Sequence, residues 1–191
     1  MSKILDMQKQ TGFIKNSTRS PEDYYITPDI AIKELLKREK FEGLGWEPAC
    51  GNGAIVKFFP NIMASDIRTD DEIVGEKGID FLKTFRKVDF IITNPPFKLA
   101  EKFIKHALEC KPNKLAIFGR IQLLEGQSRY KMFKENPPDR VYVFSNRIST
   151  SRNGTIKGGL MCFCWFVWDF KIGPKPIIKW ILCEDYGKKC R

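Results

Sequence analysis

The sequence predicts an α/β fold with a mostly parallel β-sheet and helices on both faces. Short apolar segments alternate with helix-like segments from residue 28 onward, and strand–helix alternation is typical of this fold class. The clearest strand is 88–93, VDFIIT, which is apolar, β-branched and bounded by turn residues. No helix is expected between the strand-like segments 160–170 and 176–183, which predicts an antiparallel hairpin at one edge of the sheet.

The other elements follow in chain order. A helix over 28–36 places Ile32, Leu35 and Leu36 on one apolar face, with Thr27 as its N-cap and Pro28 at its first position. The segment 146–159 is rich in Ser, Gly, Arg and Lys and predicts an exposed loop. We expect further helices over 52–59, 99–110 and 128–135, and further strands over 44–49, 62–65, 78–82, 114–118 and 140–145.

Length and composition indicate one globular domain. The chain has 191 residues, of which 42% are hydrophobic and 29% charged. No apolar run approaches the roughly 18–20 residues of a membrane helix, and the N-terminal residues lack the pattern of a secretory signal, so a cytoplasmic protein is expected. We expect a flexible basic segment over 1–20, one domain over 21–183 and a charged tail over 184–191.

The net charge and the cysteine spacing limit the classes of binding partner and of metal site that the chain could have. Lys and Arg number 33 against 23 Asp and Glu, a net charge of +10, which favours a nucleic acid partner; the alternative is a basic protein without one. The six cysteines include no C-x-x-C pair. Cys162 and Cys164 alternate within a strand-like segment, which favours one buried face over a zinc site, so we expect reduced thiols and no metal.

Unusual residues follow four expected strands, where ligands bind in open α/β sheets. The segment 47–53, EPACGNG, has glycines that permit a tight turn and close approach to a ligand. It lacks the third glycine of dinucleotide-binding loops and the lysine of phosphate loops, which argues against NAD and ATP. Asp66 can accept both hydroxyls of a ribose. Asp80 and Phe81 can bind an adenine amino group and cover its ring; the alternatives are a solvated aspartate and ordinary packing.

The most specific pattern is Asn94-Pro95-Pro96-Phe97, directly after the buried strand 88–93. The prolines stiffen the loop, so an amide oxygen and a carbonyl oxygen can accept two hydrogen bonds from a planar amine beside an aromatic ring. Asn136-Pro137-Pro138-Asp139 is an internal control. It follows a charged helix and lacks the aromatic residue, so its prolines are expected only to end that helix.

Taken together, these motifs resemble the amino-methyltransferases, in particular the phage-type N6-adenine DNA methyltransferases, over nearly all of 20–183. The family's Y-x-T-P segment corresponds to 25–28, its glycine loop to 47–53 and its acidic strand end to Asp66. Its Asp–aromatic pair corresponds to 80–81, and its catalytic (D/N)-P-P-(Y/F/W) to 94–97.

The resemblance implies a Rossmann-like class I methyltransferase with a seven-stranded sheet, an antiparallel edge strand and S-adenosylmethionine as cofactor. Asn94 and the Pro95 carbonyl would hold the adenine N6 amine while Phe97 stacks on the target base, flipped out of DNA. Catalysis would come from positioning and electrostatics, so His106 is expected to be structural or exposed rather than catalytic. The implied catalytic residues are Asn94, Pro95, Pro96 and Phe97, and the implied cofactor-binding residues are Tyr25, Thr27, Pro28, Glu47, Pro48, Ala49, Cys50, Gly51, Asn52, Gly53, Asp66, Ile67, Asp80 and Phe81.

Several alternatives remain open at this point. The acceptor could be RNA or a protein glutamine, although the charge and the Y-x-T-P segment argue against the latter; a third alternative is a binding module that no longer transfers methyl groups. Arg147, Arg152 and Lys157 are candidate phosphate contacts or part of a solvated loop. Many related enzymes carry a separate target-recognition domain, and none is expected here. Sequence specificity is then low, or supplied by 146–159, or supplied by a second subunit.

Overall fold

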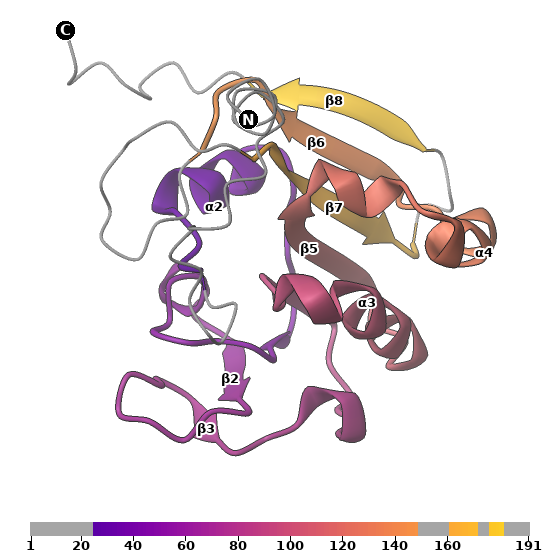
Figure 1. The fold of residues 1–191 in the computed structure, drawn as a ribbon. Helices are drawn as coiled ribbons and strands as arrows, with labels where there is room; N and C mark the ends of the chain where they lie inside the picture. The colour runs from indigo at the N-terminus through magenta and orange to yellow at the C-terminus, as the bar shows by residue number, and fades with distance from the viewer. Residues whose placement is uncertain (1–24, 149–160, 172–175, 182–191) are drawn as a thin grey trace, which may run out of the picture.

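The computed structural model describes residues 25–148, 161–171 and 176–181 (Figure 1). The expected segment 1–20 and tail 184–191 lie outside the described residues, as do most of the polar segment 146–159 and with it Arg152 and Lys157. No helix of the described residues is long and apolar enough to cross a membrane.

The centre of the fold is one eight-stranded sheet with the strand order β3-β2-β1-β4-β5-β7-β6-β8. Neighbours from β3 to β5 are parallel, β7 is antiparallel to both β5 and β6, and β8 is parallel to β6. The strands are β1 (Gly45–Glu47), β2 (Ile62–Asp66), β3 (Glu76–Lys77), β4 (Phe90–Thr93), β5 (Lys114–Arg120), β6 (Arg140–Phe144), β7 (Phe163–Asp169) and β8 (Ile177–Ile181).

The expected α/β class with a mostly parallel sheet is confirmed, and two details differ. The sheet has eight strands rather than seven. The last two strands do not pair as a hairpin, because β7 pairs along its length with β5 and also with β6. Both edges of β7 are therefore occupied, and β8 continues the sheet along the outer side of β6 (Figure 1).

Helices cover both faces of the sheet. The apolar side of α2 (Asp29–Leu36) packs into one core cluster with Phe90, Ile92 and Trp165. The opposite cluster joins Trp46 and Ile91 to α3 (Ala100–Glu109) and α4 (Gln127–Glu135), so α2 and the α3–α4 pair lie on opposite sides (Figure 1). The described 3₁₀ turns are η1 (Val56–Phe58), η2 (Phe81–Lys83), η3 (Phe97–Leu99) and η4 (Ile121–Leu124).

Three local predictions were wrong, each because of backbone chemistry near the site. The segment 52–59 forms turns and the short η1 instead of a helix, since Gly53 has a positive φ of 77° and Pro60 follows closely. The segment 78–82 enters η2 because the Asp80 side chain accepts a hydrogen bond from the Leu82 N–H at 3.1 Å. The N-cap of α2 is Pro28 rather than Thr27, without a side-chain hydrogen bond.

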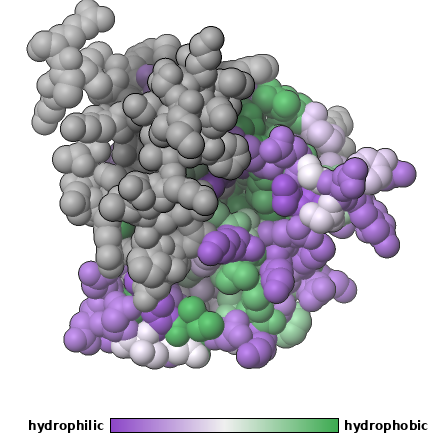
Figure 2. All heavy atoms as spheres, in the orientation of Figure 1, coloured by the Kyte–Doolittle hydropathy of each residue, from purple (hydrophilic) through white to green (hydrophobic). Residues whose placement is uncertain are grey.

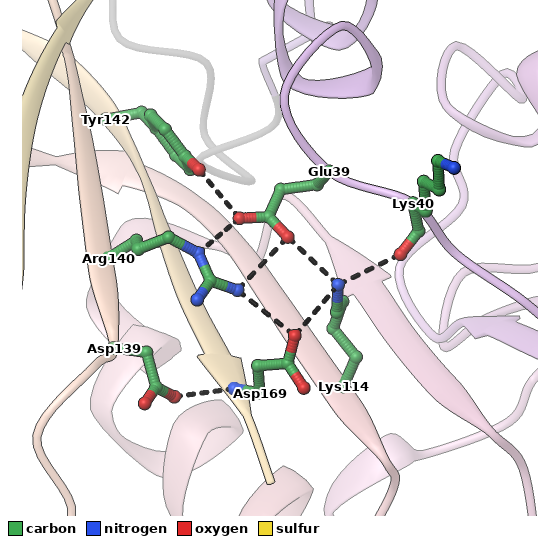
Figure 3. A network of polar contacts seen from close by, with 7 residues as sticks. All are labelled: Glu39, Lys40, Lys114, Asp139, Arg140, Tyr142 and Asp169. Atoms are coloured by element: carbon green, nitrogen blue, oxygen red, sulfur yellow. Dashed lines mark hydrogen bonds and ion pairs between the residues drawn. The ribbon is translucent and has the colours of Figure 1, made fainter. Parts of the chain in front are cut away.

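A buried polar network joins the segment after α2 to β5, β6 and β7 (Figure 3). Glu39 accepts hydrogen bonds from Lys114 Nζ at 2.9 Å, Arg140 Nη2 at 3.1 Å and Tyr142 Oη at 2.7 Å. Asp169 pairs with the same two cations, at 3.1 Å from Lys114 and 3.2 Å from Arg140. Lys114 and Arg140 begin parallel strands, so this network lies at the opposite end of the sheet from the strand carboxyl ends.

Candidate active site

A cavity of about 520 Å³ lies at the carboxyl ends of β1, β2 and β4, the edge where open α/β sheets bind ligands. Most of the site residues expected from the sequence line it: Tyr25, Thr27, Glu47, Pro48, Ala49, Cys50, Asn52, Asp66, Ile67, Asp80, Phe81, Asn94, Pro95, Pro96 and Phe97. Pro28, Gly51 and Gly53 do not line it. Pro28 caps α2, while Gly51 and Gly53 turn the loop after β1 with positive φ angles of 49° and 77°.

The carboxylate of Asp66 is held in place by two backbone N–H groups. Gly51 N donates to Oδ2 and Arg68 N donates to Oδ1, each at 2.9 Å. The glycine loop after β1 and the end of β2 are thereby joined through one side chain. Because each carboxylate oxygen has a second lone pair, Asp66 can still accept hydrogen bonds from a diol beside the cavity.

Glu47 is a buried acid with one unsatisfied oxygen. Its residue is 1% exposed, and Oε1 accepts a hydrogen bond from Ala49 N at 3.2 Å. Oε2 makes no hydrogen bond within the described structure. Burial, with a smaller contribution from the Asp66 carboxylate, raises the pKa of the Glu47 carboxyl group to about 8. A cationic group in the cavity would satisfy Oε2 and favour the ionised acid.

The Cys50 side chain belongs to the cavity wall rather than to the chemistry. Burial raises the pKa of the Cys50 thiol to about 11, so it stays protonated at neutral pH and is a poor nucleophile. Cys50, Cys110, Cys162 and Cys164 are free thiols. Among the described residues, no group of three or more His, Cys, Asp or Glu side chains could hold a metal ion.

The Asn94 amide is oriented by the segment before α2. Its Nδ2 donates a hydrogen bond to the Tyr25 carbonyl oxygen at 2.8 Å. This hydrogen bond uses one of the two N–H groups of the amide, and the Oδ1 atom of Asn94 can still accept a hydrogen bond from a ligand. The contact spans 69 residues of sequence and joins the Y-x-T-P segment to the N-P-P-F loop.

The Phe97 ring lies within an aromatic cluster. Tyr25 stacks on it with ring centroids 5.0 Å apart and an interplanar angle of 23°, and Phe163 lies at 5.8 Å. The guanidinium carbon of Arg120 lies 3.9 Å from the Phe97 ring centroid. Residues from three other segments therefore contact this ring at the edge of the cavity.

Phe81 and His106 pack together in the core beside the cavity. Phe81 is 2% exposed and contacts Trp46, Phe103 and His106, with ring centroids 4.8–5.0 Å away. His106 is buried, and its Nε2 lies 2.9 Å from the Thr84 carbonyl oxygen. His106 does not line the cavity, which agrees with the expected structural role.

Sequence reasoning missed several residues of the cavity wall. Arg68 lines the cavity, and its Nε lies 3.7 Å from Asp66 Oδ1 and 3.6 Å from Asp70 Oδ2. Lys98, Leu99 and Phe103 also line it. Two of these residues could have been predicted from their position beside a recognised motif. Arg68 is two residues after the acidic end of β2, and Lys98 directly follows the N-P-P-F motif.

The second N-P-P tripeptide has the structural role expected of it. Helix α4 ends at Glu135, directly before Asn136, and the Asn136 carbonyl accepts a hydrogen bond from Trp168 Nε1 at 3.0 Å. Asn136 does not line the cavity. Of the three candidate phosphate contacts, only Arg147 lies within the described residues, where it is exposed.

No protein-family model and no curated protein sequence matches the chain, but solved structures resemble it. One is assigned as the modification subunit of a type I restriction enzyme from Vibrio vulnificus. Its TM-score is 0.58 and its sequence identity 12%, and the match covers 95% of this chain and 50% of that subunit. A protein assigned as an RNA methyltransferase from Pyrococcus horikoshii has TM-score 0.55 and 13% identity over 87% of this chain and 98% of its own. A dimethyladenosine transferase from Plasmodium falciparum has TM-score 0.51 and 16% identity over 75% of this chain and 61% of its own.

These likenesses concern the fold, because the identities are low. The chain spans half the length of the modification subunit and nearly the whole of the archaeal protein. Together with the strand order and the site at the carboxyl ends of β1, β2 and β4, they show that the chain has the Rossmann-like α/β fold that these methyltransferases share.

Proposed function

We propose that this chain transfers a methyl group from S-adenosylmethionine to the exocyclic N6 amine of adenine in DNA. The observation that carries the proposal is the N-P-P-F loop, which lines the same cavity as Glu47 and Asp66 and in which Tyr25 orients the Asn94 amide. An acceptor site for a planar amine thus borders a site for a ligand that carries a cation and a diol.

The residues of the cavity fit S-adenosylmethionine. The unsatisfied Oε2 of Glu47 suits the ammonium group of its methionine part, and Asp66 suits its ribose hydroxyls. Asp80 and Phe81 border the cavity where an adenine would lie, and Ile67 is 61% exposed beside them. When bound, the cofactor supplies an electrophilic methyl group on a sulfonium.

In the proposed mechanism this chain contributes orientation and hydrogen-bond acceptors. The lone pair of an aromatic amine is delocalised into its ring, which makes the amine a poor nucleophile. Hydrogen bonds from the amine to Asn94 Oδ1 and the Pro95 carbonyl draw the nitrogen toward tetrahedral geometry and aim its lone pair at the methyl group. Positioning and fixed dipoles then lower the barrier without a strong general base. As the N–C bond forms, the S–C bond of the sulfonium would break to leave a neutral thioether, and the methylated nitrogen would lose one proton to water.

DNA is the proposed acceptor, and RNA is the second candidate. The net charge of +10 suits either polyanion. The restriction-enzyme modification subunit favours DNA, whereas the archaeal protein, assigned as an RNA methyltransferase and covered over 98% of its length, favours RNA. In either case the base must be flipped out or already unpaired to reach the N-P-P-F loop.

The test is methyl transfer from tritiated S-adenosylmethionine to unmethylated genomic DNA, with N6-methyladenine identified after digestion. Asn94→Ala should lower the rate by about 100-fold or more, the typical cost of removing one preorganised polar group. It should leave cofactor affinity within a factor of about 3, since Asn94 contacts the acceptor in this mechanism.

The chain offers its own matched control for this test. Asn136→Ala makes the same substitution in the second N-P-P tripeptide, away from the cavity, and should retain wild-type activity. Label in RNA but not in DNA would move the proposal to its second candidate. Cofactor binding without transfer to any polynucleotide would contradict the enzymatic proposal and favour a binding module.

A further inference from the structure

Thr93 lies at the end of β4, beside the strand end that carries Glu47. Strands β1 and β4 are parallel neighbours, and their register pairs Trp46 with Ile91. Glu47 is the last residue of β1 and Thr93 is the last residue of β4, so the two side chains belong to adjacent strand ends. Thr93 is fully buried, and it directly precedes Asn94 of the N-P-P-F loop.

The side chains of Thr93 and Glu47 each have an unsatisfied polar atom. Within the described structure, neither Thr93 Oγ1 nor Glu47 Oε2 makes a hydrogen bond of ordinary geometry. Such buried atoms are rare in folded proteins, because burial has removed their water without supplying a partner. The hydroxyl nevertheless acts on the acid, since it opposes the rise in the Glu47 pKa that burial causes. The two unsatisfied groups therefore lie within reach of each other.

The other groups around Glu47 leave its Oε2 to Thr93. Burial is the main cause of the raised Glu47 pKa, and the Asp66 carboxylate at the end of β2 adds to it. Burial also raises the pKa of the Cys50 thiol to about 11, so the thiol stays neutral. Among the described residues, the donors that favour the ionised acid are the Ala49 N–H and the Thr93 hydroxyl. The Ala49 N–H donates to Oε1, which makes Thr93 the donor available to Oε2.

We propose that Thr93 is a positioning residue for Glu47, and that its hydroxyl donates a hydrogen bond to Oε2 when Glu47 ionises to hold a cation. The inference rests on the proposed function, in which that cation is the ammonium group of S-adenosylmethionine. Thr93 does not line the cavity, so it acts through Glu47. A hydroxyl can accept from the protonated acid and donate to the carboxylate. The bond to the carboxylate is the stronger of the two, so Thr93 favours the form of Glu47 that binds a cation.

The first measurement is the pKa of Glu47 in the protein without cofactor. NMR titration of protein with ¹³C-labelled glutamate carboxyl groups follows it, and Glu47→Gln identifies the resonance by removing it. Thr93→Val removes the hydroxyl and keeps a branched side chain. It should raise the Glu47 pKa by about one unit, which corresponds to one hydrogen bond to a charged group. Thr93→Ser keeps the hydroxyl and should titrate as the wild type does.

Ser65→Ala is the matched control for this titration. Ser65 lies on β2, the other neighbour of β1, and it is as fully buried as Thr93. Its hydroxyl, however, accepts a hydrogen bond from Trp46 Nε1 at 2.9 Å. Ser65→Ala thus removes a buried hydroxyl beside the same strand and should leave the pKa of Glu47 at the wild-type value.

The second measurement is the affinity for S-adenosylmethionine at pH 7, by isothermal titration calorimetry. Thr93→Val should bind about tenfold more weakly, because a pKa higher by one unit makes Glu47 harder to ionise. In the Glu47→Gln background, the same substitution should change the affinity by less than about twofold, since no acid remains to be ionised. This double-mutant cycle separates an effect through Glu47 from general damage to the strand end.

An unchanged Glu47 pKa in Thr93→Val would overturn the inference, and so would an equal loss of affinity with and without the Glu47 carboxyl group. A pKa that rises as far in Thr93→Ser as in Thr93→Val would assign the effect to packing and would also overturn it. If the pKa and the affinity change as expected in a protein that transfers no methyl group, the proposed reaction is refuted and the role of Thr93 stands. Wild-type protein that binds no S-adenosylmethionine would overturn both proposals.

Discussion

Asn94 and Glu47 illustrate how single residues of this site depend on partners that are distant in the sequence. The Asn94 amide is oriented by the hydrogen bond from its Nδ2 to the Tyr25 carbonyl, and its Oδ1 can still accept a hydrogen bond from a donor amine. Glu47 lines the same cavity, and its buried Oε2 has no hydrogen-bond partner among the described residues. In the proposed function the first arrangement would accept an N–H donor and the second a cation, so the two sites would differ in chemistry as well as in position.

Glu47 predicts that cofactor affinity depends on pH. Because the Glu47 pKa is raised to about 8, the acid is largely protonated at pH 7, and a bound ammonium group requires it to ionise. The affinity for S-adenosylmethionine should therefore rise by up to about tenfold per pH unit below pH 8 and level off above it. Isothermal titration calorimetry across this range measures the effect, and Glu47→Gln should bind more weakly at high pH and flatten the profile.

Without cofactor, the same substitution should stabilise the fold. A folded-state pKa above the unfolded value means that the contribution of Glu47 to stability is full below pH 4.5 and is lost as the pH rises toward 8. At pH 8, Glu47→Gln should therefore raise the free energy of unfolding, on the order of a few kcal/mol. Equal denaturation midpoints for the two proteins at pH 8, or an unchanged pH profile of binding in the variant, would contradict this role of Glu47.

At the scale of elements, strand identity was predictable and local backbone geometry was not. The strands around 88–93 and 114–118 are marked by continuous apolar runs, because both of their faces are buried. The segment 52–59 has helix-like composition but contains Gly53, whose positive φ continues the loop, so only η1 forms. Composition does not encode such a φ value.

Pairing between distant strands also lay beyond the sequence pattern. The alternation of residues in 160–170 indicated a strand, and β7 is that strand. Nothing local distinguishes insertion between β5 and β6 from a hairpin with 176–183. The choice follows from burial, because every residue of β7 is buried and an edge position would have left one side of the strand uncovered.

At the site, the motifs indicated the cavity residues, whereas the contact of Tyr25 with Asn94 and that of Arg120 with Phe97 came only from the fold.

The Glu39 network predicts where the fold is sensitive to charge. Burial opposes ionisation of Glu39, but hydrogen bonds from Arg140, Lys114 and Tyr142 outweigh it and lower the pKa of the carboxyl group. Glu39→Ala leaves two partly buried cations with Asp169 as their remaining acid (Figure 3). It should lower the free energy of unfolding by about 3–5 kcal/mol, measured by urea denaturation at neutral pH.

The matched control is a glutamate in an exposed ion pair. Glu135 pairs with Lys131 on α4, with side chains 57% and 82% exposed, and Glu135→Ala should change stability by less than about 0.5 kcal/mol. Because the folded pKa of Glu39 lies below its ordinary value, its contribution is present above that value and lost as the pH falls. The difference between wild type and Glu39→Ala should therefore shrink in acid, and a difference that does not vary with pH would count against the network.

At the scale of the whole molecule, one sheet joins two halves that have different roles. The half from β3 to β4 supplies three residues of the cavity wall: Glu47, Asp66 and Asn94. The half from β5 to β8 carries the Glu39 network and the antiparallel strand. On the face shown in Figure 2, hydrophilic residues cover much of the described surface, and a hydrophobic area lies at the lower edge, over the β2–β3 region. Ile67, which lines the cavity, and Val74 are exposed in the chain segment between β2 and β3.

The two halves should respond together to a ligand in the cavity. Both core clusters extend from β1 or β4 to β6 and β7: one joins Phe90 to Trp165, and the other joins Trp46 to Trp168. Since each cluster bridges β1 or β4 to β7, opening of β7 requires opening of the cavity wall. S-adenosylmethionine at about a hundred times its Kd should therefore stabilise the whole domain by about 2.7 kcal/mol. It should slow hydrogen exchange of the slowest amides of β7 and of β4 by the same factor, about 100-fold. Protection confined to β4 would show that the halves open independently, and the sheet would then join two cooperative units instead of forming one.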